Sequence, residues 1–515
     1  MSQMMNDSAA PSSGSNRRNV TIALMVATFL TAIEGTIVST AMPTIVSELH
    51  GLERMNWVFA VYLLTSAVTT PIFGKLADLF GRKIIFTIGT VLFLIGSTLC
   101  GFAQDMDQLI WFRALQGIGA GAIMPVTFTI IGDLYPMEQR ARVQGIIGMI
   151  WGVAGVVGPL VGGFFVDVLT WHWIFFINVP FGLLSMVLVA ASLKESFERS
   201  RKKIDYAGAV TFTIGMVALL YALQRGSETH SWASPSMLLL YAAAVVFLAL
   251  FLYVQTKASE PMLPLKLFRI RDIAVASVVS FLTSMVMIGI MVYIPMWIQG
   301  VLGYGATYAG FAITPMTITW TVGAFFSGRL LVQKGSRYSA ILGIIVLIIG
   351  SLWLALLDIS ASQFAFYVIT GLYGIGFGIV VTVFTVTAQS AVDWTMRGVS
   401  TASITLFRTL GQTFGVAVYG TYFNSRLASE LSSKQAESGG MKLEDINRLI
   451  NPETAAQLPE GGRQAMREVL VSGMHSIFLL LVVFSVAALA ISFLLPKRQS
   501  GAQPAAMPAN AGGAE

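Results

Sequence analysis

Long apolar stretches constrain this chain more than any other feature of its sequence. An α-helix rises 1.5 Å per residue, so about 20 apolar residues cross the roughly 30 Å hydrocarbon core of a bilayer. The continuous length of these runs excludes a membrane β-barrel, whose strands would alternate over about ten residues. The sequence therefore predicts an all-α, polytopic membrane protein with 14 transmembrane helices, at 20–42, 56–75, 84–104, 108–132, 143–166, 173–193, 205–224, 236–255, 273–298, 305–332, 338–357, 363–390, 399–423 and 471–495.

The distribution of lysine and arginine predicts the orientation of these spans. If the spans alternate, 22 of the 32 basic residues lie on the same side as the N-terminus. The short loops on the other side hold only Arg54 and Arg225, and cytoplasmic loops are the ones enriched in Lys and Arg. We expect a bacterial cytoplasmic membrane protein with both termini in the cytoplasm. Its basic pI needs no nucleic-acid partner.

Two similar loops suggest an internal duplication. GKLADLFGRK at 74–83 and GRLLVQKGSR at 328–337 share the pattern G-x-L-x-x-x-x-G and a basic end, although a short match of this kind also arises by chance. Two spans lie between the halves, so we expect a 6 + 2 + 6 arrangement. The predicted parts are disordered cytoplasmic tails at 1–19 and 496–515, a six-helix bundle at 20–193, a basic linker with two extra helices at 194–271, and a second bundle at 272–495 that includes an outer loop at 424–470.

Three charged residues lie deep inside the predicted spans: Glu34, Arg113 and Arg408. A charge at this depth is costly and marks a partner or a pathway. Counted at 1.5 Å per residue, Glu34 and Arg113 both lie about 21 Å from the cytoplasmic boundary, so they can pair if their helices are neighbours. Two interpretations stay open: a static bridge that fixes helix packing, or a carboxyl group that binds and releases a proton as its surroundings change.

The fifth span contains the glycine-rich stretch GVAGVVGPLVGG. Small residues at spacings of three and four allow close helix contact, and a proline removes one backbone hydrogen bond. The stretch predicts either a rigid packing surface or a hinge. Its members are Gly152, Gly155, Gly158, Pro159, Gly162 and Gly163.

The loop GKLADLFGRK offers a possible cytoplasmic gate. Asp78 lies between two helix ends and could pair with Arg142 or Arg140 in one conformation only; a permanently solvated turn is the alternative. Glycine permits the tight turn that the loop requires. The candidate gate residues are Gly74, Asp78, Gly81, Arg82 and Arg142.

These motifs together resemble a known family. GKLADLFGRK, LIWFRALQGIGAGA and GVAGVVGPLVGG are similar to loop and helix motifs of the major facilitator superfamily. The fourteen spans, with IEGTIVSTAMP and WHWIFFINVPFG, resemble its 14-helix drug:proton antiporters, over roughly residues 20–496. The resemblance implies two six-helix bundles around a central cavity and multidrug efflux by alternating access.

The resemblance also implies roles for the candidate residues. Asp78 and Arg82 would form the cytoplasmic gate, and Glu34 with Arg113 would couple transport to protons. The glycines and Pro159 of the fifth span would form the antiporter hinge. The chain departs from the family in having Glu34 where aspartate is common, and its second loop, GRLLVQKGSR, lacks an acidic residue. Gln116 and Arg408 are possible cavity residues without an assigned role.

We therefore predict a proton-coupled antiporter that exports amphipathic drugs or biocides, cationic or neutral, and works as a monomer among membrane lipids. Export of a specific metabolite, lipid or peptide, or proton-coupled uptake, is the alternative. The four histidines are scattered, and the sequence has no HExxH motif and no phosphate-binding loop, which argues against an enzyme. No cofactor and no metal are expected.

Overall fold

The computed structural model describes residues 16–135, 137–195, 205–229, 233–259, 261–359, 361–393, 396–433, 446, 449 and 460–496. Within these residues every regular element is helical. The elements are α1 Arg17–Leu49, η1 Leu52–Arg54, α2 Met55–Phe80, α3 Arg82–Gly101, α4 Met106–Leu134, α5 Met137–Val168, α6 Trp173–Phe176, α7 Asn178–Ser192, α8 Tyr206–Thr229, α9 Pro235–Lys257, η2 Leu265–Arg269, α10 Arg271–Met296, the π-helix η3 Trp297–Val301, α11 Ala306–Ala355, α12 Gln363–Ser390, α13 Arg397–Ser433 and α16 Glu460–Ser492.

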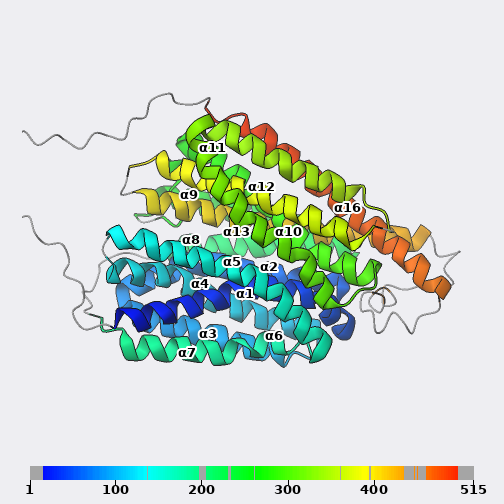
Figure 1. Cartoon of the computed structure of the whole chain (residues 1–515), viewed down its shortest axis with the longest axis horizontal. Helices are drawn as coiled ribbons and strands as arrows, with labels where there is room; N and C mark the ends of the chain where they lie inside the picture. The colour runs from blue at the N-terminus through cyan, green and yellow to red at the C-terminus, as the bar shows by residue number, and fades with distance from the viewer. Residues whose placement is uncertain are drawn as a thin grey trace, which may run out of the picture.

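The helices form two bundles that lie side by side (Figure 1). In the N-terminal bundle, α1 packs on α5 and α7, and α4 packs on α2 and α3. In the C-terminal bundle, α11 packs on α12 and α16, and α10 packs on α13. The bundles meet mainly where α5 contacts α11 and α2 contacts α13. These two contacts place a pair of helices from each bundle at the interface.

The predicted all-α, polytopic fold is confirmed. Twelve of the described helices are long and apolar enough to cross a membrane. One of them, α11, is two helices joined at Gly335, where a positive φ of 81° breaks the helical path. The long helix α13 is not among the twelve. Two spans in α11, together with α13, are compatible with the fourteen predicted segments, and the number that cross the membrane stays a prediction.

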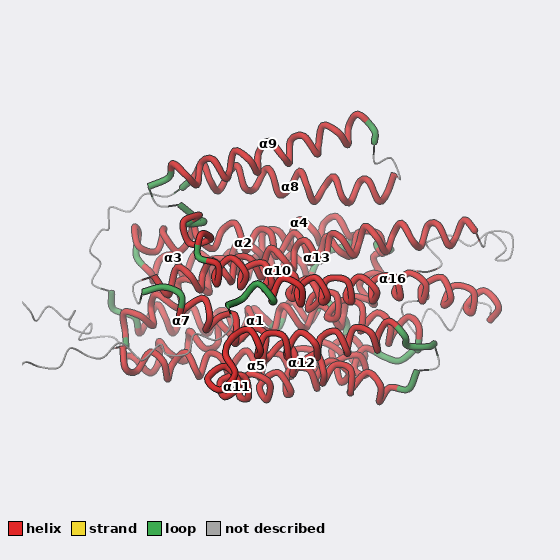
Figure 2. Tube along the Cα trace, turned by 90° about the horizontal axis from the view of Figure 1, so that it is seen from above, coloured by secondary structure: helices red, strands yellow, loops and turns green. Residues whose placement is uncertain are grey.

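Helices α8 and α9 form a hairpin beside the bundles (Figure 2). Phe212 and Met216 of α8 bury their side chains with Leu64 and Val68 of α2. Apolar residues of α13 pack against the same cluster. The hairpin therefore covers the junction of α2 with α13, one of the two places where the bundles meet.

Several helices extend beyond the apolar runs that predict them. α13 continues to Ser433 and α16 begins at Glu460, so parts of the predicted outer loop 424–470 are helical, and most of its remainder lies outside the described residues. The predicted span 173–193 is divided into α6 and α7. Pro180, two residues into α7, has no N–H to continue the hydrogen-bond ladder of α6.

Two faces of the molecule serve as landmarks below. The termini face is the end at which α1 starts and α16 ends (Figure 1). The opposite face is the end at which α1 ends and α2 begins. By the sequence prediction, the termini face is cytoplasmic.

Candidate functional site

Glu34 and Arg113 form an ion pair inside the N-terminal bundle. Glu34 lies on α1 and Arg113 on α4, and Nη1 of Arg113 contacts Oε1 of Glu34. The two side chains are 0% and 1% exposed, so the pair is fully removed from solvent. The equal depths counted from the sequence permitted this pair, and the structure contains it.

Polar side chains from two further elements complete the surroundings of the pair. Asn178, the first residue of α7, donates from Nδ2 to Oε2 of Glu34 at 2.9 Å and to Oγ of Ser97 at 2.9 Å. Gln116 accepts from Nη1 of Arg113 at 2.7 Å. Each of these side chains is fully buried. Both carboxylate oxygens of Glu34 are thus occupied, one by a cation and one by a neutral amide.

The guanidinium of Arg113 also contacts α2. Its Nε donates to the carbonyl oxygen of Val58 at 3.3 Å, and its Cζ lies 4.1 Å from the ring centre of Tyr62. A cation over an aromatic face is attracted by the ring quadrupole. Arg113 therefore has partners on two sides, Glu34 on α1 and the backbone and ring of α2.

The glycines of α5 bring this helix against α1. A Cβ atom added at Gly158 would collide with Thr36, and one added at Gly162 would collide with Thr40. Both threonine hydroxyls also donate to carbonyls of α1 itself, at 2.9 Å each. Glycine is required here because the backbones of two helices approach with no room for a side chain.

The same helix contacts α11, and this contact loosens toward the termini face. A Cβ at Gly163 would lie 2.5 Å from the backbone of Thr307, and a Cβ at Gly155 would lie 2.5 Å from the methyl group of Thr317. At Gly152, nearest the termini face, the closest atom of α11 is 4.0 Å away, in Thr321. We call the contacts of residues 152–163 with α1 and α11 the α5 seam. Along this seam the contact with α11 is tight at Gly163 and Gly155 and loose at Gly152.

Hydrogen bonds join the bundles near the opposite face. Asp167, at the end of α5, accepts from the backbone N–H groups of Ala306 at 3.1 Å and Thr307 at 2.9 Å, and so caps the start of α11. Gln299 donates to the carbonyl oxygen of Thr40 at 3.0 Å. Carboxylates are stabilised at helix N-termini by the free N–H groups and the helix dipole. These contacts hold the opposite face closed.

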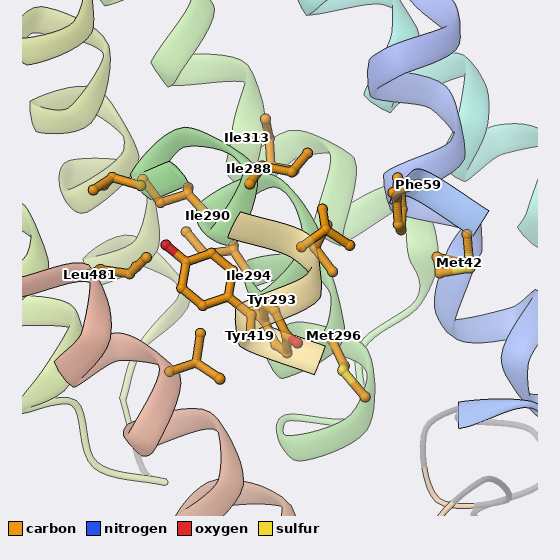
Figure 3. Close-up of a cluster of buried hydrophobic side chains, with 14 of the residues drawn as sticks. Met42, Phe59, Ile288, Ile290, Tyr293, Ile294, Met296, Ile313, Tyr419 and Leu481 are labelled. Atoms are coloured by element: carbon orange, nitrogen blue, oxygen red, sulfur yellow. The ribbon is translucent and has the colours of Figure 1, made fainter. Parts of the chain in front are cut away.

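A buried apolar cluster reinforces this closure (Figure 3). It contains Met42 of α1 and Phe59 of α2 together with Tyr293 and Met296 of α10 and Tyr419 of α13. The hydroxyl of Tyr293 donates to Oδ1 of Asn56 across the interface at 3.4 Å. Water has no path through a packed cluster of this kind.

At the termini face, Arg82 has two carboxylate partners within the N-terminal bundle. Its Nε lies 3.1 Å from Oδ2 of Asp133, and its Nη1 lies 3.6 Å from Oε1 of Glu195. Glu195 also accepts from the backbone N–H groups of Arg82 at 2.8 Å and Lys83 at 3.2 Å, which caps the start of α3. Gly81, the residue before α3, makes the turn between α2 and α3 with a positive φ of 98°.

The gate predicted from sequence is described only in part. The side chains of Asp78, Arg140 and Arg142 lie outside the described residues, so their pairing stays a prediction. Gly74 lies within helix α2 and not in the turn predicted from sequence, and a Cβ there would meet only Pro125, at 3.8 Å.

Arg408 lies in the C-terminal bundle, on α13, and differs from Arg113 in its surroundings. Its side chain is half-buried, and within the part of the chain that the structure describes no hydrogen bond or ion pair reaches it. The two possible cavity residues are therefore separated: Gln116 belongs to the Glu34–Arg113 site and Arg408 does not.

A comparison with protein families gives this architecture a context. The model of the Major Facilitator Superfamily matches residues 24–416, which is most of the chain. The chain belongs to the major facilitator superfamily. It is accordingly a transporter located in a membrane.

Two relatives within the superfamily are similar over nearly their full length. The multidrug transporter protein MdtP of Bacillus subtilis is 36% identical over 510 residues, which cover 94% of each chain. Multidrug resistance protein 3 of the same organism is 35% identical over 483 residues, 92% of this chain and 94% of the relative.

Solved structures of transporters share the fold. A bacterial homolog of the human lysosomal transporter Spinster, in an inward-facing and unoccupied conformation, matches with a TM-score of 0.67 and 17% identity, over 93% of this chain and 98% of the other. A mutant of the nucleoside transporter NupG matches with a TM-score of 0.61 and 11% identity, over 93% of this chain and 100% of the other. At these identities the likeness concerns the fold alone.

Several residues of the candidate site escaped the sequence analysis. Asn178 stands in WHWIFFINVPFG, where a lone polar residue in an apolar run was the only available signal. Asp133 and Glu195 lie at helix ends, where acidic residues are common on any protein surface. Glu195, at the start of the predicted basic linker, is bound to the start of α3.

Proposed function

We propose that this chain is a proton-coupled antiporter that exports amphipathic drugs or biocides across the bacterial cytoplasmic membrane, with both termini in the cytoplasm. Two multidrug proteins similar over more than nine tenths of the chain support the class of substrate. The buried Glu34–Arg113 pair supports the coupling to protons, and it is the single observation on which the coupling rests.

The pair is suited to proton coupling because its charge balance changes with one proton. With Glu34 ionised, the pair is neutral overall. Protonation of Glu34 leaves the Arg113 cation without a counter-ion in a fully buried site, and breaking a buried pair in this way costs about 3–5 kcal/mol. Any conformation that gives Arg113 another partner or water then becomes favoured. The existing contacts of Arg113 with Val58 and Tyr62 would hold the guanidinium at α2 when Glu34 is protonated.

Asn178 can form a hydrogen bond with Glu34 in both protonation states of that carboxyl group. Its Nδ2 donates to the carboxylate, whereas its Oδ1 is buried and has no hydrogen-bond partner among the described residues. An amide that turns over presents Oδ1 instead and accepts from a carboxylic acid. One side chain thus stabilises Glu34 before and after it binds a proton.

The α5 seam supports alternating access. Its contacts are tight near the opposite face and loose near the termini face, which is the geometry expected when a central space opens to the cytoplasm. Rocking of the bundles about this seam would break the Asp167 cap on α11 and close the termini face. The opposite ends of one interface would then open in turn.

Reconstituted protein tests the proposal. Liposomes containing a pH-sensitive dye receive an imposed pH gradient and then an amphipathic compound such as ethidium, and the substrate-triggered proton flux is recorded. We expect this flux in the wild-type protein and its loss in Glu34→Gln. Glu48→Gln is the matched control, because Glu48 lies on the same helix, is exposed, and accepts a hydrogen bond from Nε1 of Trp171 at 2.8 Å.

The outcomes separate the parts of the proposal. Proton flux that survives Glu34→Gln would show that Glu34 serves packing or substrate binding and not coupling. Transport of the compound without any proton flux would retain export and reject antiport. Equal loss in both glutamine variants would indicate a general defect of α1.

A further inference from the structure

A polar stripe on α13 surrounds Arg408. Thr401, Thr405, Arg408 and Gln412 recur at spacings of four, three and four, so they lie on one face of the helix. All four are exposed or half-buried. Arg408 stands eleven residues after Arg397, the first residue of α13, which places it about 16 Å along the helix from the termini face.

Helices of both bundles flank this stripe. On one side of it, Gln389 of α12 donates to Oγ1 of Thr401 at 2.9 Å. On the other side, Gly420, about 90° around the helix from the stripe, packs against Asn56 of α2. The stripe thus lies between a helix of the C-terminal bundle and one of the N-terminal bundle. The hydroxyls of Thr401 and Thr405 donate to carbonyls of their own helix, so the charge of Arg408 is the part of the stripe that needs water or a polar ligand.

The apolar spans of its own bundle provide no carboxylate for Arg408. Positions 273–357, 363–390, 396–429 and 469–496 contain no aspartate or glutamate. In the N-terminal bundle the membrane-embedded acid Glu34 is already bound to Arg113 and is fully buried. No hydrogen bond or ion pair to Arg408 exists within the described ranges. A permanent cation in a half-buried position is therefore left for an anion from outside the protein.

We propose that Arg408 is the anion-binding residue of the central cavity and that its ligands are amphipathic compounds carrying a carboxylate, zwitterions included. This inference rests on the proposed function and narrows its substrate class. A planar guanidinium binds a carboxylate through two parallel hydrogen bonds. Zwitterions are neutral overall, so they remain within the cationic or neutral class expected from the sequence.

A matched pair of dyes tests the inference. Rhodamine B carries a free carboxylate, and its ethyl ester has the same ring system with that charge removed. Binding of each dye to the purified full-length protein in detergent is followed by fluorescence anisotropy. We expect Arg408→Gln to weaken binding of rhodamine B by about 10- to 100-fold, the range of a hydrogen bond to a charged group. Binding of the ester should stay within about twofold.

Two further variants control the result. Arg408→Lys keeps the charge without the two-pronged geometry and should retain part of the affinity for the acid. Arg426→Gln removes another arginine of α13, one that is paired with Glu430 at 2.9 Å, and should change neither dye. Ester binding by Arg408→Gln shows that this variant is folded.

Three results would overturn the inference: equal weakening of both dyes, unchanged binding of the acid, or a wild-type protein that binds the ester and ignores the acid. The first would make Arg408 a residue that shapes the cavity. If the ester still triggers proton flux in Arg408→Gln, the proposal of export by antiport is retained even when the proposal of a carboxylate site at Arg408 is rejected. A wild-type protein that binds neither dye would count against both proposals.

Discussion

Arg113 and Arg408 are both arginines inside membrane-embedded helices, but they differ in burial and in their bonding partners. Arg113 is 1% exposed and is bound to Glu34, Gln116 and the backbone of α2. Arg408 is half-buried on a polar helix face, with no partner among the described residues. The charge of the first is neutralised within the protein, and the charge of the second is not.

This difference indicates which ligand each charged site can bind. A neutralised pair responds to a proton, because one proton removes the neutrality. An arginine without a counter-ion can bind an anion, because an anion from outside the protein would supply the missing counter-ion. On the two proposals made above, the N-terminal bundle holds the coupling site and the C-terminal bundle holds a ligand site.

The largest expected effect is on stability. Arg113→Gln leaves Glu34 buried without its cation and should lower the free energy of unfolding by about 3–5 kcal/mol. Arg408→Gln removes a charge that has no partner and should change it by about 0.5 kcal/mol or less. Thermal unfolding of both purified variants in one detergent measures the contrast. A comparable loss in Arg408→Gln would mean that Arg408 has a structural partner, and the comparison would fail.

A second variant removes both members of the buried pair. Glu34→Gln with Arg113→Gln replaces two charges by two neutral amides, so the double variant should be more stable than the sum of the single losses predicts, by about 1–3 kcal/mol. Proton flux should nevertheless stay absent. Thermal unfolding of the two single variants and the double variant gives the coupling energy. Additive losses would show that Glu34 and Arg113 do not depend on each other in solution.

The fold was predictable from sequence because its determinant is local. A run of about 20 apolar residues specifies a membrane helix by itself. The chain has so many of these runs that the lipid bilayer is the only environment that can surround them. The helix joint at Gly335 was likewise marked by the loop GRLLVQKGSR. The extensions of α13 and α16 were not predictable, since polar helical residues outside the membrane resemble a loop in hydropathy.

The candidate site was predictable only where charge marked it. Glu34 and Arg113 stood out because a charge in an apolar run needs a reason, and their equal depth allowed a pair. Asn178 and Glu195 act through hydrogen bonds to residues more than 100 positions away in sequence, and nothing local indicates those partners. Arg408 was visible, but its lack of a partner is a property of three dimensions.

The comparison can also be reversed by supplying Arg408 with a carboxylate. Gln412 lies one helical turn after Arg408 on the same polar stripe, so Gln412→Glu places an acid within reach of the guanidinium. We expect the preference for rhodamine B over its ester to fall about tenfold, which corresponds to about 1.4 kcal/mol. Thr409→Ser, a mild change beside the stripe, is the control. An unchanged preference in Gln412→Glu would show that Arg408 does not hold the carboxylate.

The smallest expected effects concern the α5 seam, since sites in separate bundles can influence each other only if the bundles move. A methyl group at Gly155 would lie 2.5 Å from Thr317, whereas one at Gly152 would have its nearest neighbour at 4.0 Å. Gly155→Ala should therefore slow export severalfold by wedging the seam. Gly152→Ala should leave the rate within about twofold and raise stability by up to about 1 kcal/mol, the helix propensity of alanine over glycine. Initial rates of dye export from proteoliposomes measure both. Equal rates in the two variants would place the pivot elsewhere and leave the proton site and the anion site without a mechanical link through α5.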